Sequence, residues 1–214
     1  MAFSESDKTT ILRLKSAIAS YYNLSMKKLG DRQLEALFYE NCVISGGCIS
    51  SLFHAEAVAD VDLYPTSVKA LKTIRDYIVD SGKNIKTVDS YGDQPVEPFK
   101  LVTQNAVTLT NDVQFIYIDA WTECKKKFDF LHCQPHYDLA TQKLYISEAQ
   151  FNAIKNKQLI PTGLTEIKEK RLEKYQKRGW VMEKIKPQVF SWSELNVPGI
   201  VAQEISQIFP NVIK

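Results

Sequence analysis

The first third of the chain alternates between helical and extended patterns of apolar residues. Apolar side chains at helical spacing in ESDKTTILRLKSAIASYYNLS, among them Leu14 and Ile18, predict a long amphipathic helix. A second helix is predicted over DRQLEALFYE, with Asp31 as its N-cap. NCVIS then reads as a buried strand, Gly46-Gly47 as a turn and CISSLFHAEAV as a short helix.

A second strand and a third long helix follow. DVDLY is the strand, closed by Pro65, and a helix is predicted through SVKALKTIRDYIVD, with Thr66 or Ser67 as its cap. After residue 85 the pattern becomes β-branched and aromatic, so strands dominate to about residue 146. These strands are NIKTV, KLVTQNAVTLT, VQFIYI, FDFLHC and KLYIS.

The last third of the chain returns to helical patterns. Ser147 and Gln150 form a capping box ahead of SEAQFNAIKNK, and helices are also predicted in TEIKEKRLEKYQKRG and VPGIVAQEISQIF. The pattern predicts an α/β (α+β) protein with a mixed central sheet flanked by helices. Residues 1–146 would form the core with its N-terminal helices, and 147–214 a C-terminal helical lobe.

Composition excludes several function classes. The 214 residues carry a formal net charge of +2, which argues against a histone-like nucleic-acid partner. The polar start lacks a secretory signature, and no apolar run reaches the ~20 residues that span a bilayer, so a cytoplasmic protein with no membrane partner is expected. The four cysteines lack metal-ligand spacing and are expected to be unpaired thiols.

The segment from Gly46 to Asp62 carries the candidate chemistry. Two glycines between a strand and a helix allow a tight turn with accessible backbone N–H groups, which suit phosphate. Asp60 and Asp62 alternate with apolar residues, so both carboxylates point to one face of their strand. Paired carboxylates with phosphate oxygens suit Mg²⁺, and two ions roughly 3.5–4 Å apart can assist an in-line phosphoryl displacement.

The stretch ISGGCISSLFHAEAVADVDLY resembles the signature of the polymerase-β-type nucleotidyltransferase superfamily. The runs VQFIYIDAWTECKKKFDFLHCQPHYD and RLEKYQKRGW are similar to a phage and large-virus branch of it, so the resemblance covers about residues 40 to 180. It implies a nucleotidyltransferase-like fold and transfer of a nucleoside monophosphate from an NTP. CCA-adding members carry Arg-Asp soon after the glycines, whereas this chain reads Ile-Ser-Ser, so CCA addition is not expected.

The resemblance also implies a metal site with three carboxylates. Asp60 and Asp62 would bind Mg²⁺ or Mn²⁺ together with a third aspartate on a neighbouring strand. Asp129, bracketed by two phenylalanines in FDFLHC, is preferred over Asp119, which a turn explains equally well. Asp129 is also the candidate base that accepts the proton of the nucleophile.

The same resemblance implies a nucleotide-binding set. Gly46 and Gly47 would hold the triphosphate through backbone amides, with the hydroxyls of Ser45 and Ser50 as helpers. On the basic helix, Arg171 and Lys174 share a face with Arg178 and could reach the triphosphate or an acceptor nucleic acid. A solvated helix surface explains these basic residues equally well.

The sequence therefore predicts a metal-dependent nucleotidyltransferase with an NTP as substrate. The acceptor would be RNA, a protein or a small molecule. Two alternatives remain open: a catalytically inactive nucleotide- or RNA-binding module of the same fold, and a metal-dependent phosphohydrolase. The phosphohydrolases usually add histidine ligands, and the three histidines here have no ligand spacing.

Overall fold

A computed structural model describes residues 3–80, 99–103, 105–163 and 166–182. The chain divides into two compact units, Met1–Met182 and Glu183–Lys214, and the description below concerns the first. The predicted strand NIKTV and the predicted helix VPGIVAQEISQIF lie outside the described residues. The boundary at residue 147 stays a prediction. In the described part of the chain, no helix has the length and apolar character needed to cross a membrane.

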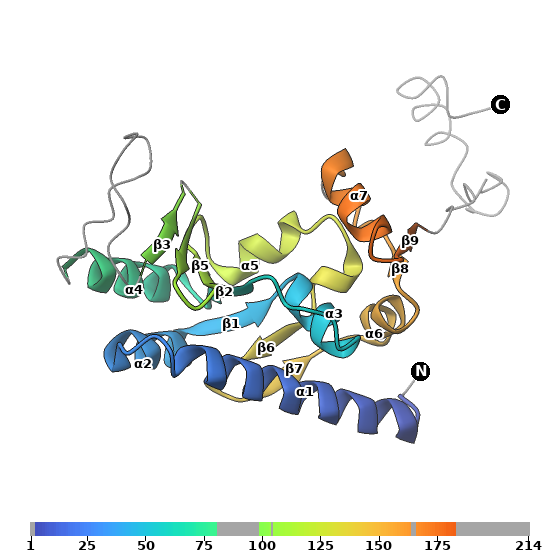
Figure 1. Cartoon of the computed structure of the whole chain (residues 1–214), viewed down its shortest axis with the longest axis horizontal. Coiled ribbons are helices and arrows are strands. Elements are labelled where there is room, and N and C mark those ends of the chain that lie inside the picture. The colour runs from blue at the N-terminus through green and yellow to red at the C-terminus, as the bar shows by residue number, and fades with distance from the viewer. Residues whose placement is uncertain (1–2, 81–98, 104, 164–165, 183–214) are drawn as a thin grey trace, which may run out of the picture. The chain divides into compact units, whose positions relative to one another are not determined.

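Most elements follow the order that the sequence pattern predicts (Figure 1). Elements that were not predicted include the helix Trp121–Cys124 and the strands His136–Asp138, Gln158–Leu159 and Val181–Met182. The α-helices are α1 (Glu5–Met26), α2 (Arg32–Asn41), α3 (Gly47–Phe53), α4 (Val68–Asp80), α5 (Trp121–Cys124), α6 (Glu148–Lys155) and α7 (Glu169–Gln176). Two 3₁₀ turns are η1 (Lys125–Lys127) and η2 (Leu131–Cys133). The strands are β1 (Cys42–Ser45), β2 (Val61–Pro65), β3 (Phe99–Val102), β4 (Ala106–Leu109), β5 (Val113–Ile116), β6 (His136–Asp138), β7 (Lys143–Tyr145), β8 (Gln158–Leu159) and β9 (Val181–Met182).

Side-chain caps fix the starts of three helices. The Asp31 carboxylate accepts a hydrogen bond from the Leu34 amide at 3.0 Å, and the Ser67 hydroxyl accepts one from the Ala70 amide at 3.1 Å. Ser147 and Gln150 form the reciprocal capping box at α6. Each cap satisfies amides that a helix start leaves without an internal partner, and all three were predicted from the sequence.

Seven strands form one mixed sheet in the order β3-β4-β5-β2-β1-β6-β7. Strand β2 runs parallel to β5 and antiparallel to β1, so β2 lies at the centre of the sheet. Strands β8 and β9 form a separate two-stranded parallel sheet. The mixed sheet with flanking helices confirms the predicted α/β class.

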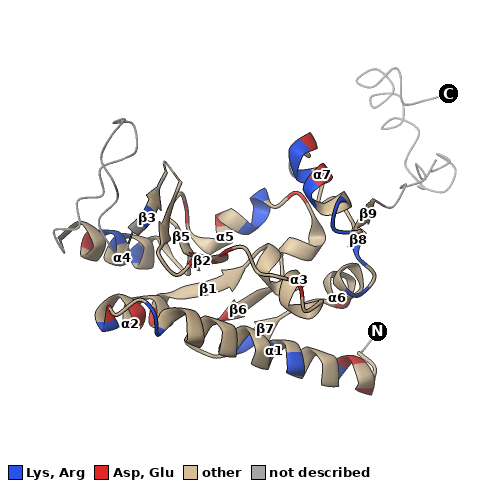
Figure 2. Cartoon of the chain, viewed as in Figure 1, with Lys and Arg blue, Asp and Glu red and all other residues tan. Residues whose placement is uncertain are grey.

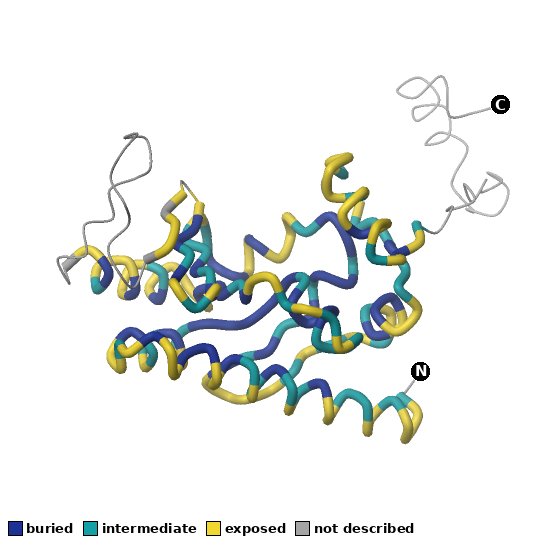
Figure 3. The backbone as a smooth tube through the Cα atoms, viewed as in Figure 1, coloured by how far each residue is buried: buried dark blue, intermediate teal, exposed yellow. Residues whose placement is uncertain are grey.

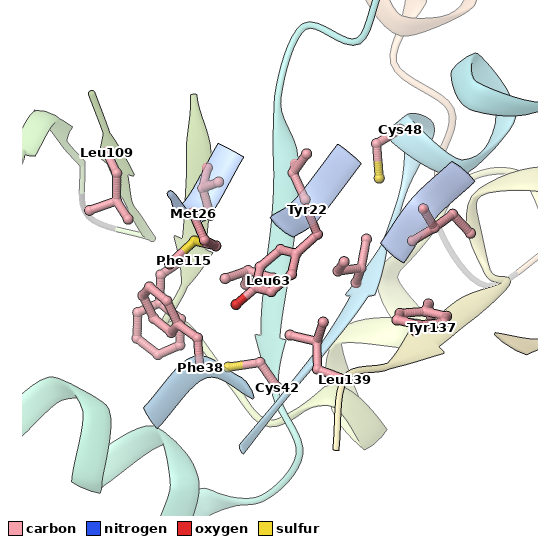
Figure 4. Close-up of a cluster of buried hydrophobic side chains, with 14 of the residues drawn as sticks. Tyr22, Met26, Phe38, Cys42, Cys48, Leu63, Leu109, Phe115, Tyr137 and Leu139 are labelled. Atoms are coloured by element: carbon pink, nitrogen blue, oxygen red, sulfur yellow. The ribbon is translucent and has the colours of Figure 1, made fainter. Parts of the chain in front are cut away.

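Side-chain alternation gives the central sheet two different faces. Val61 and Leu63 of β2 point into the main core with α1, α2 and α4, and Figure 4 shows part of this cluster. Tyr64 points to the opposite face and packs with Val43 and Trp121. Strand β1 is buried along its whole length (Figure 3). Asp62 follows the same alternation as Tyr64, so it lies on the face opposite the main core.

The segment FDFLHC corrects the prediction of a strand. Asp129 and Phe130 make only an isolated bridge, between Phe130 and Pro161, and the chain then enters η2. The Leu131 amide donates to the Ile160 carbonyl, and the Cys133 amide donates back to Phe130. Residues 131–133 therefore satisfy their backbone groups through a turn and a crossing loop, although their aromatic neighbours Phe128 and Phe130 are typical of a strand.

Among the described residues, the strand predictions VQFIYI and KLYIS are confirmed in outline as β5 and β7. KLVTQNAVTLT forms two antiparallel strands, β3 and β4, instead of one. All four cysteines are buried and unpaired, as expected: Cys42, Cys48, Cys124 and Cys133.

Candidate active site

The glycine turn and the carboxylates meet at the end of β1. Ser45 is the register partner of Asp62, which places Gly46 directly beside that carboxylate. A Cβ atom added to Gly46 would lie 2.9 Å from Asp62 Oδ2, and Gly46 has a φ of 92°, which favours glycine. Only a residue without a side chain fits between the turn and the carboxylate.

A cavity of about 220 Å³ opens at this point, named here the carboxylate pocket. Its lining brings together Gly46, Gly47, Asp60 and Asp62 with three basic residues of the α7 region. The basic residues are Arg171, Lys174 and Arg178. Asp60 immediately precedes β2 and is exposed, whereas Asp62 is half-buried. The predicted grouping of glycine turn, aspartate pair and basic helix is therefore present in one pocket.

The surroundings of Asp62 disfavour its charged form. Burial, with a further contribution from the nearby Asp60 charge, raises the pKa of Asp62 to about 7, although Lys174 and Arg171 oppose the shift. In the described part of the chain, Asp62 Oδ1 is buried and accepts no hydrogen bond. A buried carboxylate oxygen without a donor is costly unless a cation approaches it. The Asp60–Asp62 pair therefore fits one divalent cation, with oxygen ligands of the kind that Mg²⁺ and Mn²⁺ prefer.

The glycine turn leads into α3 without a side-chain cap among the described residues. The Gly46 amide donates to the Cys133 carbonyl at 3.1 Å, so this N–H is already used inside the fold. Gly47 and Cys48 begin α3 and both line the carboxylate pocket. The first amides of a helix have no internal acceptor, so a phosphate group would meet the amides of Gly47 and Cys48.

Helix α7 is held against the turn by Tyr175. The Tyr175 hydroxyl lies 3.5 Å from the position of a Cβ on Gly47 and 3.2 Å from Cys133 Sγ. Tyr175 belongs to a small second core with Phe130, Cys133, Leu159 and Trp180. This core fixes the basic face of α7 beside the carboxylates, and Figure 2 shows the Lys and Arg residues on α7.

The histidine behind the pocket has a structural environment. His132 is fully buried, stacks against Phe130 and packs on Tyr175 and Trp180. Burial lowers the pKa of His132 to about 3, so its imidazole is neutral. This agrees with the lack of ligand spacing among the histidines in the sequence.

The three basic residues have different partners. Arg171 Nη1 lies 3.0 Å from Asp129 Oδ2. Arg178 forms an ion pair with Glu56 and donates to Ser51 Oγ at 2.7 Å. Among the described residues, Lys174 has no ion pair within 4 Å, and its charge acts on Asp62 at longer range. Lys174 is therefore the basic residue that a bound anion would engage without breaking an existing ion pair.

Asp129 lies at the edge of the site. It is buried and does not line the carboxylate pocket, but Arg171 connects it to that pocket. Asp119 forms an ion pair with Lys127 and accepts a hydrogen bond from the Ala120 amide, in keeping with a turn residue. Within residues that the structure describes, no three His, Cys, Asp or Glu side chains are grouped as a metal site. The third-ligand role of Asp129 stays a prediction.

Two predicted helpers have their hydroxyls committed to the backbone. Ser45 Oγ donates to the carbonyl oxygens of Cys133 and Pro135, at 3.0 and 2.7 Å. Ser50 Oγ donates to the Gly47 carbonyl at 2.9 Å. The pocket lining contains neither serine, so their arrangement explains the fold of the turn and gives no support to a nucleotide contact.

A family model described as "Gabija anti-defense 2 family protein" matches residues 13–157. The chain belongs to this family. The matched part contains the glycine turn, both pocket aspartates and Asp129, whereas α7 lies beyond it. No curated protein sequence matches the chain.

Two solved structures are similar to this chain at low sequence identity and low TM-score. An apo form of a CCA-adding enzyme matches at 10% identity and a TM-score of 0.43, covering 89% of this chain and 46% of that one. A tRNA-processing enzyme with CTP matches at 15% identity and a TM-score of 0.34, covering 56% of this chain and 32% of that one. The chain spans less than half the length of either structure, and values this low decide nothing about activity.

Several residues that line the carboxylate pocket were not predicted from the sequence, among them Gln114, Ser51 and Tyr175. Gln114 is the register partner of Asp62 on the parallel strand β5, and its amide donates to Thr108 Oγ1 at 2.9 Å. Ser51 and Tyr175 reach the pocket from α3 and α7. The polar residue in VQFI, between two core residues, was the available signal for Gln114, because alternation places it on the face of Asp62.

Proposed function

We propose that the chain is a metal-dependent nucleotidyltransferase that moves a nucleoside monophosphate from an NTP to an acceptor. The observation that carries this proposal is the buried Asp62 Oδ1, which has no hydrogen-bond partner among the described residues and lies beside Asp60 and the Gly46 turn. These groups offer ligands for a divalent cation at the place where backbone amides can meet phosphate. Phosphoryl transfer requires mainly positioning and charge neutralisation, and the carboxylate pocket provides both.

Each pocket residue has a defined part in the proposed transfer. Asp60 and Asp62 would hold Mg²⁺ or Mn²⁺, which when bound neutralises the charge that develops on the phosphates. The amides of Gly47 and Cys48 would hold the triphosphate, and Lys174 would pair with it from α7. The two aspartates would thus bind the metal ion, and the basic helix α7 would neutralise the negative charge of the phosphates.

Asp129 is the proposed base, and Arg171 is the residue that positions it. A triphosphate gives Arg171 a second anionic partner, which releases an Asp129 oxygen from the 3.0 Å ion pair. That oxygen would take the proton of the acceptor hydroxyl while its oxygen bonds to the α-phosphorus. The bond from the α-phosphorus to the β-phosphate oxygen breaks, and pyrophosphate leaves.

One observation favours a second candidate, an inactive nucleotide-binding module of the same fold. Asp129 is engaged by Arg171, and the described residues hold no group of three candidate ligands. Such a module would keep the contacts to phosphate and lack the base. In either case we propose that nucleotide chemistry in this pocket serves the anti-defense role that the family description names.

The test is a transfer assay with the full chain. Each NTP, labelled at the α-phosphate, is incubated with Mg²⁺ or Mn²⁺ and with total RNA or cell extract. We expect label on an acceptor with the wild type and its loss in Asp60→Ala and Asp62→Ala. Asp76→Ala, on the exposed surface of α4, is the matched control and keeps full transfer.

Separate variants then decide the third carboxylate. Asp129→Asn is expected to lose transfer on the order of 100-fold or more, as expected for loss of a catalytic proton acceptor, whereas Asp119→Asn keeps it. NTP binding without transfer in the wild type would establish the inactive module. Release of γ-labelled phosphate without acceptor labelling would establish a phosphohydrolase. Either result overturns the transferase proposal.

A further inference from the structure

A second cavity lies beside the sheet edge formed by β6 and β7. It has a volume of about 630 Å³ and is named here the aromatic groove. Its lining residues come from α5, η1, β6, β7 and the start of α6. They are Trp121, Lys125, Lys126, Gln134, His136, Leu144, Tyr145, Ile146, Ser147 and Gln150. None of these residues belongs to the carboxylate pocket.

Three aromatic rings in contact line the aromatic groove. The His136 ring is stacked on Tyr145, with centroids 4.9 Å apart and an angle of 11° between the planes. His136 also contacts Trp121, with ring centroids 5.0 Å apart and the planes tilted by 50°. Trp121 is buried, whereas Tyr145 ends the row and is 45% exposed. An exposed aromatic side chain held by a stack presents a surface on which a further flat ring can stack.

The charge of the aromatic groove is positive. Lys125 and Lys126 line it, and its lining contains no Asp or Glu. Lys126 forms an exposed ion pair with Glu123, and among the described residues Lys125 has no ion pair within 4 Å. The charge of Lys125 reaches His136, since it contributes to the lowered pKa of that imidazole, after burial. The groove therefore combines a neutral ring stack with adjacent cations.

The aromatic groove and the carboxylate pocket occupy one cross-strand row of the sheet. Asp62 is the register partner of Ser45, Ser45 of His136, and His136 of Tyr145. Directly paired residues point to the same face, so this row joins the two sites on the face opposite the main core. The row spans three strand spacings, about 14 Å between Asp62 and Tyr145. Ser45, between the two sites, is fully buried and its hydroxyl donates to the Cys133 and Pro135 carbonyls, so a ligand that reaches both sites must pass over this segment.

We propose that the aromatic groove binds single-stranded nucleic acid, with an unpaired base stacked on Tyr145 and a phosphate beside Lys125. Stacking on aromatic rings beside a basic groove is the usual mode of binding single strands with little sequence preference. A duplex hides its bases and leaves Tyr145 without a partner. The chemistry is shared by RNA and DNA, and the experiment below distinguishes the two.

The position of the aromatic groove also indicates where the end of the bound strand would lie. A strand that stacks on Tyr145 and crosses over the segment 133–135, which covers Ser45, would bring its terminal hydroxyl to the carboxylate pocket. This second step makes the strand the acceptor of the transfer and rests on the proposed function. The binding of the strand to the aromatic groove does not.

The test measures binding in the absence of NTP and metal. Fluorescence anisotropy follows a labelled oligouridylate, an oligothymidylate and a duplex of equal length with the full chain at low salt. We expect both single strands, or one of them, to bind more tightly than the duplex. Tyr145→Leu should weaken single-strand binding at least about fivefold, because one base loses its stacking partner. Tyr145→Phe keeps the ring and should bind like the wild type.

The contribution of Lys125 is measured by the salt dependence of binding. Lys125→Gln should reduce the slope of log K against log salt by about 0.7, the effect of one phosphate contact in a single strand. Lys143→Gln, on exposed β7 outside the groove lining, is its control and leaves the slope unchanged. Equal affinity for single strand and duplex would overturn the proposal, as would unchanged binding by Tyr145→Leu or absence of binding by the wild type.

The acceptor step has its own control. Asp62→Asn, which lies outside the groove lining, should keep oligonucleotide binding while losing transfer. If that variant binds the strand but the wild type transfers nothing, the proposed function fails and the binding proposal stands. If the wild type transfers nucleotide and Tyr145→Leu does so equally well to the same oligonucleotide, the aromatic groove is not the acceptor site.

Discussion

The carboxylate pocket and the aromatic groove share a face of the sheet and differ in what they bury. In the carboxylate pocket, Asp62 is half-buried, its Oδ1 has no donor among the described residues, and the Asp60 charge is nearby. In the aromatic groove, Tyr145 exposes an apolar ring next to Lys125. The carboxylate pocket holds a carboxylate oxygen of Asp62 away from solvent. The aromatic groove exposes the ring of Tyr145 to solvent.

The difference indicates two kinds of ligand. The half-buried Asp62 carboxylate beside the exposed Asp60 destabilises the free protein and gains most from a compact cation, so the carboxylate pocket is specific for charge. An exposed ring costs the protein little and gains from any flat ring, so the aromatic groove is tolerant of sequence. Substitutions in one site should therefore leave the other intact, and the predictions below use that separation.

The largest effect is expected from Gly46→Ala. The new Cβ would lie 2.9 Å from Asp62 Oδ2, and Ala disfavours the φ of 92° at this position. Nucleotide transfer should fall on the order of 100-fold or more, and the free energy of unfolding by about 1–2 kcal/mol from the backbone alone. Oligonucleotide binding to the aromatic groove should not change. The measurements are the transfer assay, denaturant unfolding and anisotropy.

Gly30→Ala is the matched control for this prediction. Gly30 also has a positive φ, 72°, but a Cβ there meets no atom within 4 Å. It should lose a similar backbone contribution to stability and keep full transfer. If both variants lose transfer equally, the close approach of Gly46 to Asp62 has no special role.

The next effect concerns the pH dependence of stability. The pKa of Asp62 is raised from its usual value of 3.8 to about 7, so folding favours the protonated carboxyl. The stabilisation from protonated Asp62 is complete below about pH 4 and is lost as the pH rises through about 7. Between about pH 5 and 8, metal-free wild type should lose on the order of 2 kcal/mol of unfolding free energy relative to Asp62→Asn.

Denaturant unfolding of both proteins at the two pH values measures this difference. Saturating Mn²⁺ should restore stability to the wild type at the higher pH, because a ligand that binds the folded state adds to its stability. Parallel profiles of unfolding free energy against pH for wild type and Asp62→Asn would show that folding does not raise the pKa of Asp62. Single-strand binding by Asp62→Asn again serves as the control for the other site.

A smaller effect separates two basic residues of the carboxylate pocket. Arg178→Gln breaks an ion pair with Glu56 in which both side chains are about one-quarter exposed, so the loss of stability should be about 1 kcal/mol. Lys174→Gln breaks no ion pair with the described residues and should weaken NTP binding several-fold without a stability cost. Thermal unfolding and NTP titration measure the two effects, and a reversed pattern would show that the assignments are exchanged.

The parts of the fold that could be predicted are those that depend on residues close together in the sequence. The caps at Asp31 and Ser147 depend on residues three positions apart, β1 is a short apolar run and β2 has a clear apolar alternation. The failure at FDFLHC has a long-range cause: its backbone pairs with residues 160–162 and with Gly46, which the local pattern does not contain. Strand propensity there was overridden by tertiary contacts.

The site was predictable where one segment carries it. Gly46, Gly47, Asp60 and Asp62 lie within 17 consecutive residues, and the structure brings all four to one pocket. The ion pair of Asp129 with Arg171 joins residues 42 positions apart, and no pattern in the sequence indicates it. The stack of Trp121, His136 and Tyr145 depends on strand register, so it was visible only once the pairing of β6 and β7 was known.

The most direct test of the central claim is Mn²⁺ binding, measured by electron paramagnetic resonance in the presence of an NTP. The wild type and the Asp76→Ala control should bind Mn²⁺ with equal affinity. Asp60→Asn and Asp62→Asn should each bind it at least about tenfold more weakly, because each removes a carboxylate ligand. Equal Mn²⁺ affinity in wild type and Asp62→Asn would contradict the claim that these aspartates hold a cation beside the glycine turn.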